Sequence, residues 1–280
     1  MKNTFFLTLW ILILGVLGFE YWQLHHAPTQ SLLTLLQATG KIPTSFIISP
    51  DPGRSLGLTL GFLGFGTILL TNLYIFRKRM GIMQNIGKLT NWFNFHIFCG
   101  LLGPSFILFH CNFKVRGLVA ISFWSMVVSM ASGIVGRYAY GQVAKKNTEY
   151  GKESEFFLER FRSILTKKKI NLPEPELNSY LVRAQAMVGA HEESVNPISA
   201  FFASLAGDIR LMFLSVPAPA AAGKRASLTL KFYAINYRKA QTVESFQKLM
   251  GYWHAFHMPF AVFMYLAAVF HIAAALIFGV

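Results

Sequence analysis

The sequence predicts an all-α integral membrane protein with five transmembrane helices. Of its 280 residues, 54% are hydrophobic and only 14% are charged, whereas a soluble domain usually carries about a quarter charged residues. Five apolar stretches are each long enough to cross a hydrocarbon core about 30 Å thick. One long polar stretch separates the fourth from the fifth, which predicts a helical insertion on one side of the membrane.

The first apolar stretch covers residues 5–22 and follows Lys2. It has the length of a signal sequence, but no small-x-small cleavage site follows before His25 and His26, so we expect an uncleaved anchor. Residues 31–40 then form a short amphipathic segment that ends on a glycine, which predicts a short helix.

The other predicted spans are residues 56–76, 92–113, 118–140 and 252–280. The domain prediction is accordingly a set of four transmembrane helices with a short outer loop over residues 1–140, a polar segment over 141–250, and a fifth transmembrane helix over 251–280.

The polar segment is basic and has the periodicity of amphipathic helices, for example over residues 153–169. Pro173 and Pro175 predict a break, Asn196 followed by Pro197 predicts a helix start, and residues 217–223 predict a linker of small residues. The segment either docks a partner protein or lies flat on anionic lipid.

The distribution of charge predicts the orientation. With Lys2 inside, 21 of the 26 Lys and Arg residues lie in segments on the inner side, as the positive-inside rule requires. The amino terminus is then cytoplasmic and the carboxyl terminus periplasmic, in an energy-transducing membrane such as the bacterial inner membrane. The net charge of +14 is therefore explained by basic segments on the inner side, beside membrane lipid. No nucleic-acid partner is expected.

Two predicted spans carry paired histidines. His96 and His110 lie fourteen residues apart on the third span, and His257 and His271 lie fourteen apart on the fifth. On a helix this spacing returns to within roughly 40° of the same face, about 21 Å further along. Both spans run from inside to outside, so His96 shares its depth with His257, and His110 with His271.

This pattern predicts two haems, each held by one histidine from each span, because haem iron is commonly bound by neutral imidazole nitrogens on rigid helices. The alternative for each histidine alone is a hydrogen-bonded core residue. Gly100 and Gly103 lie on the same face as His96 and leave room for a flat macrocycle. The alternative for these glycines is close helix packing.

Two further residues are candidates near the inner pair. His254 is a poorer match to His271, roughly 100° away around the helix, and is expected to bind a haem propionate or exchange protons with a quinone. Arg137 either reaches to the interface beside aromatic residues or pairs with a propionate. No catalytic residue is assigned.

The spacing of His96, His110, His257 and His271 on the third and fifth spans resembles the ferric reductase-like transmembrane domain, a group of di-haem membrane cytochromes b. That resemblance implies two stacked b-type haems that pass electrons across the bilayer. The chain departs from the group because it has no nucleotide-binding fingerprint and carries an insertion of about 110 residues. Its electron donor or acceptor is therefore expected to be a quinone or another protein.

The function predicted from the sequence is a di-haem b-type cytochrome that carries electrons between a quinone pool and a partner redox protein. One alternative is a haem-bearing anchor subunit of a larger oxidoreductase complex, comparable to that of respiratory nitrate reductase. The other is a non-redox transporter whose histidines serve metal ions or protons.

Overall fold

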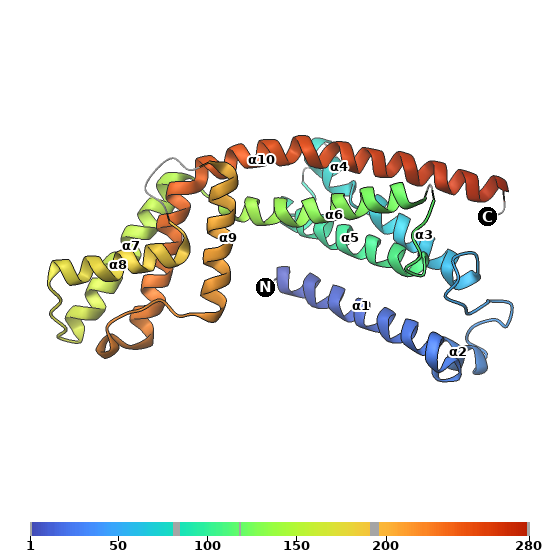
Figure 1. The fold of residues 1–280 in the computed structure, drawn as a ribbon, viewed down its shortest axis with the longest axis horizontal. Helices are drawn as coiled ribbons and strands as arrows, with labels where there is room; N and C mark the ends of the chain where they lie inside the picture. The colour runs from blue at the N-terminus through green and yellow to red at the C-terminus, as the bar shows by residue number, and fades with distance from the viewer. Residues whose placement is uncertain (1, 81–84, 118, 191–195, 279–280) are drawn as a thin grey trace. The chain divides into compact units, whose positions relative to one another are not determined.

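The computed structural model describes residues 2–80, 85–117, 119–190 and 196–278, and within these ranges every regular element is helical. The chain divides into two compact units, one of Met1–Gly133 with His257–Val280 and one of Ile134–Phe256. Figure 1 labels the helices in chain order. Two of them, α6 and α10, contribute residues to both units.

Five helical stretches are long and apolar enough to cross a membrane: Thr4–His26, Ser55–Arg79, Leu89–His110, Val119–Gln142 and Ala220–Phe278. The predicted all-α class is confirmed, and so is the prediction of five helices that are long and apolar enough to cross a membrane. Many large apolar side chains on these helices are exposed, including Phe62 at 64% and Phe270 at 72%. Lipid on those faces removes the cost of leaving them in water. Position 118 and positions 279–280 of the predicted spans lie outside the described residues.

The second span is interrupted, which the sequence analysis did not predict. Helix α3 (Ser55–Leu70) ends two residues before α4 (Leu73–Arg79) begins. The Oγ1 of Thr71 donates to the Ile68 carbonyl at 2.6 Å, and the Nδ2 of Asn72 donates to the Leu69 carbonyl at 3.1 Å. Threonine and asparagine side chains compete in this way with the helical pattern of hydrogen bonds, which explains the break.

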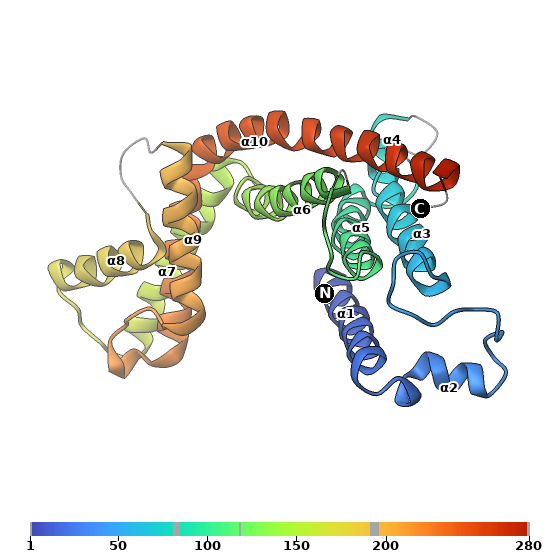
Figure 2. The same cartoon turned by 45° about the vertical axis from the view of Figure 1, so that its right-hand side comes forward.

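Helices α3 and α5 (Leu89–His110) pack side by side (Figures 1 and 2). The contact depends on glycines. A Cβ added at Gly103 would lie 2.5 Å from Cγ1 of Ile68, and one at Gly64 would lie 2.7 Å from Cδ1 of Ile107. Small residues allow this approach of two helix backbones in a membrane.

Helix α1 (Lys2–His26) packs on the opposite side of α5 through polar contacts as well as apolar ones. The indole Nε1 of Trp10 donates to the Ser105 hydroxyl at 3.1 Å, and the Tyr21 hydroxyl donates to Oδ1 of Asn112 at 2.8 Å. The following helix, α2 (Leu32–Ala38), is the predicted short helix, and the Ser31 side chain caps it.

The second unit contains the end of α6 (Val119–Gln142), then α7 (Asn147–Lys167), α8 (Glu174–Val188) and α9 (Pro197–Phe213), and the first part of α10 (Gly223–Phe278). Figure 2 shows α7, α8 and α9 beside that part of α10. Their core includes Phe161, Leu181, Val188 and Leu230. The predicted helix start at Asn196 is confirmed, since its Oδ1 accepts from the backbone N–H of Ile198 at 2.9 Å.

A fully buried arginine holds this unit together. Arg238 on α10 is 0% exposed and forms an ion pair with Asp208 of α9 at 2.8 Å. Its guanidinium also donates to the carbonyls of Val188 at 2.9 Å and Ser204 at 3.0 Å. Helix α10 continues past this point without interruption, so the expected boundary between residues 250 and 251 falls inside one helix.

The glycine contacts give a paired test of the packing between α3 and α5. We expect Gly103→Ala to lower the melting temperature, because its methyl group would overlap Ile68 and the Gly64 backbone oxygen; overpacking typically costs about 1–3 kcal/mol. The matched control on the same helix is Gly100→Ala, because a Cβ there has no neighbour within 4 Å. Thermal unfolding in detergent, followed by circular dichroism, measures both. Equal melting temperatures for the two variants would contradict the contact.

Candidate functional site

The four predicted ligand histidines all belong to the first compact unit and lie on two helices. His96 and His110 lie on α5, and His257 and His271 lie on the second part of α10. All four are partly buried. A partly buried histidine in an apolar helix needs partners for its ring nitrogens, so these partners define what each ring can do.

His96 is oriented by the break between α3 and α4. Its Nδ1 lies 3.0 Å from the backbone oxygen of Thr71, and a carbonyl oxygen can only accept, so Nδ1 carries the proton. The neutral ring therefore has its lone pair on Nε2. The Tyr74 ring lies 5.5 Å from the His96 ring, measured between centroids. The interruption of the second span thus supplies the carbonyl that fixes this tautomer.

His110 is oriented by the first turns of α3. Its Nδ1 lies 2.7 Å from the backbone oxygen of Gly57, so Nδ1 again donates and Nε2 holds the lone pair. Gly61 makes this possible, because a Cβ at that position would lie 2.9 Å from the same Nδ1. Any side chain at residue 61 would displace the ring.

His257 is oriented by α6. Its Nδ1 lies 2.6 Å from the Ser132 hydroxyl oxygen, and that hydroxyl donates its proton to the Ser129 carbonyl at 2.9 Å. Because the hydroxyl has one proton, the serine oxygen accepts from Nδ1, and Nε2 of His257 has the lone pair. Gly133 lies next to this ring, with an added Cβ 3.9 Å from Cε1.

His110 and His271 interact electrostatically with one another. These are the residues predicted to share the outer depth of the membrane. They come from α5 and α10, two helices whose histidines are separated by most of the chain.

Tyr265 connects α10 to the same break that orients His96. Its hydroxyl donates to the Ile68 carbonyl at 2.9 Å, accepts from Nδ2 of Asn72 at 2.8 Å, and lies 3.2 Å from Oγ1 of Thr71. Two turns before it on α10 lies His257. The break therefore holds His96 directly and holds the His257 helix through Tyr265.

The surroundings of the remaining candidates differ. Gly103 faces α3, which favours the helix-packing alternative over a place beside a macrocycle, whereas a Cβ at Gly100 would have no neighbour within 4 Å. His254 is exposed, with its ring 6.4 Å from that of Trp253. Arg137 is partly buried. Both belong to the second unit, and their roles at a haem propionate or a quinone stay predictions.

Sequence reasoning missed the residues that orient the histidines. Two of these residues, Thr71 and Ser132, are recognisable in the sequence as polar residues within apolar spans. Thr71 and Asn72 are adjacent polar residues inside the predicted second span, and Ser132 belongs to a set of serines on one side of α6 with Ser125 and Ser129. Gly57 acts through its backbone oxygen, which no sequence pattern reports.

The described residues contain no cluster of three or more His, Cys, Asp or Glu side chains placed to hold a metal ion. Cys99 and Cys111 are buried free thiols. The imidazoles on α5 and α10 are donors of the kind that bind haem iron. The chain matches no family model, no curated protein and no solved structure.

The role of Tyr265 can be tested by removing its hydroxyl. We expect Tyr265→Phe to destabilise the protein by about 0.5–1.5 kcal/mol, because the Asn72 amide and the Ile68 carbonyl each lose one of their hydrogen-bond partners. The matched control is Tyr252→Phe on the same helix, where the tyrosine is 66% exposed. Thermal unfolding in detergent measures both variants. A melting temperature equal to that of the control would show that the three contacts carry no energy.

Proposed function

We propose that this chain is a di-haem b-type cytochrome of a membrane, in which His96 and His257 hold one haem and His110 and His271 hold the other. One observation carries the proposal. Three of these histidines use Nδ1 to donate a hydrogen bond, to Thr71, to Gly57 or to Ser132. This is the arrangement by which proteins orient histidine ligands, because it fixes the tautomer and makes Nε2 more basic.

The electrostatic interaction between His110 and His271 supports the same proposal. If a haem were bound there, these two imidazoles would be the residues that hold its iron. A transporter for metal ions is less well supported, since the described residues offer no group of three or more ligands.

A bound haem iron accepts and releases single electrons. The chain's own residues hold the imidazoles at fixed orientations, exclude water from the rings with the apolar faces of α5 and α10, and keep Nδ1 protonated through carbonyl and hydroxyl acceptors. Two haems at two depths would carry electrons from one membrane face to the other. We propose a quinone pool and a partner redox protein as the two ends of that path, with a larger oxidoreductase complex as the alternative partner.

The first experiment measures haem content. We expect the chain purified in detergent to give a reduced-minus-oxidised spectrum of b-type haem. His110→Ala and His271→Ala should each remove the same haem and leave the other, whereas His96→Ala and His257→Ala should each remove the second. The control is His26→Ala, at an exposed ring stacked on Trp22, which should keep both. A purified chain without b-type haem would falsify the proposal.

The second experiment tests the hydrogen bond on His257. Ser132→Ala removes the acceptor of the Nδ1 proton, so the imidazole becomes a weaker electron donor to iron and the ferric state loses stabilisation. We expect the midpoint potential of one haem to rise, and its retention to weaken by about tenfold. Redox titration of the full chain measures both haems separately.

The matched control for that experiment is Ser125→Ala, which removes a hydroxyl on the same helix that donates to the Ile121 carbonyl at 2.8 Å. Its two midpoint potentials should match those of the unaltered protein. Equal shifts of both haems in Ser132→Ala, or a shift as large in the control, would show that the serine acts on the helix rather than on the histidine.

A further inference from the structure

Helix α9 has two faces of opposite kind. Its inner face, which includes Ala200, Ser204, Gly207 and Leu211, is buried. Its approach to α8 is so close that a Cβ at Gly207 would lie 2.2 Å from the Val188 backbone oxygen. The outer face carries large apolar side chains that are 47–82% exposed: Ile198, Phe202, Ile209, Met212 and Phe213.

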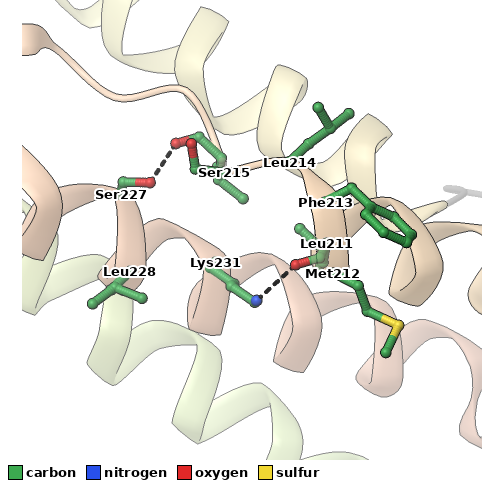
Figure 3. Close-up of a pocket in the computed structure, with 9 residues that line it drawn as sticks. Leu211, Met212, Phe213, Leu214, Ser215, Ser227, Leu228 and Lys231 are labelled. Carbon is green, nitrogen blue, oxygen red and sulfur yellow. Dashed lines mark hydrogen bonds between the residues drawn. The ribbon is translucent and has the colours of Figure 1, made fainter.

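These exposed residues form one stripe. At 100° per residue they fall within about 100° of the helix circumference, which is the width of a face that packs on an apolar partner. Met212 is 79% and Phe213 82% exposed, and Figure 3 shows both projecting at the end of α9. Such a stripe is costly in water, so it has a partner in the protein's working environment.

The position of α9 identifies the partner. Ala200 packs with Ala139 of α6 and Phe246 of α10, and Asp208 accepts a hydrogen bond from the Tyr138 hydroxyl at 2.8 Å. Tyr138 and Ala139 lie in the last turns of α6, a helix apolar enough to span the membrane that ends at Gln142. Helix α9 therefore packs beside the last turns of a helix that is apolar enough to span a membrane.

Charge points to the same partner. The polar segment between residues 145 and 248 contains 16 of the 26 Lys and Arg residues, and basic segments next to transmembrane helices are attracted to anionic lipid headgroups. At the end of the stripe a groove of about 310 Å³ is lined by Phe213, Leu214, Leu228 and Lys231. The Lys231 amine donates to the Leu211 carbonyl at 3.2 Å (Figure 3). The groove is also lined by Ser215 and Ser227, so both apolar and polar groups are available to a lipid there.

We propose that α9 is an interfacial helix that lies on the bilayer, with Ile198, Phe202, Ile209, Met212 and Phe213 buried among lipid chains just below the headgroups. Helices of this kind bury their apolar face about 5–10 Å into the boundary between headgroups and acyl chains. The occupant of this face is the lipid surface, which the five apolar helices already require beside the end of α6. The interaction does not depend on the bound haems.

Site-directed spin labelling of the full chain in nanodiscs with anionic lipid tests this proposal. Cys99 and Cys111 are replaced by alanine, and single cysteines are introduced by Phe202→Cys, Ile209→Cys and Phe213→Cys. The matched control is Val182→Cys on α8, where valine is also exposed, at 62%. Each label is measured for collisions with oxygen, which concentrates in lipid, and with a water-soluble nickel chelate.

We expect the ratio of oxygen to nickel collisions to be several-fold higher at all three stripe positions than at residue 182. A ratio equal to that of the control would place the stripe in water and overturn the proposal. Low collision rates with both reagents, together with a co-purified protein, would identify a protein partner instead and overturn it as well. All labels replace exposed side chains, and the unaltered circular dichroism spectrum of each variant confirms that it folds.

Discussion

The Nδ1 nitrogen of a histidine inside an apolar helix needs a hydrogen-bond partner, and this requirement shapes the packing of the first unit. Water is not available in the hydrocarbon core, so the partner has to be a backbone or side-chain acceptor. The chain provides one for three of the four histidines: the Thr71 carbonyl between α3 and α4 for His96, the Gly57 carbonyl of α3 for His110 and the Ser132 hydroxyl of α6 for His257. The same bonds that stabilise the buried rings also set their tautomer and orientation.

Satisfying these rings dictates how the helices approach one another. His110 reaches Gly57 only because Gly61 has no side chain, and α3 comes close to α5 only because Gly64 and Gly103 have none. At the break, the Thr71 carbonyl accepts from His96 as well as from the Tyr74 backbone N–H, and Tyr265 gains three partners. Helix packing and histidine orientation therefore depend on the same residues in this unit. The glycines and the helix break allow the close approach that both require.

Hydropathy was sufficient to predict the class and the number of apolar helices, because lipid exposure selects for long apolar runs whatever their neighbours. The caps at Ser31 and Asn196 were also predictable, since they depend on one side chain and the adjacent backbone. The break in the second span was not, although Thr71 and Asn72 stand out in its sequence. Whether two such residues interrupt a helix depends on partners such as Tyr265, nearly two hundred positions away. Gly103, expected beside a macrocycle, proved to face α3 because helix contact is also set by distant residues.

The second histidine of each proposed pair lies on α10, on the far side of the polar unit in the sequence. During synthesis, α5 is therefore made long before α10. Each proposed histidine pair therefore lacks its second member until the ribosome has made α6 through α9 and then α10. Under the proposed function, neither haem could gain its second histidine ligand before α10 has been made, after the whole polar unit.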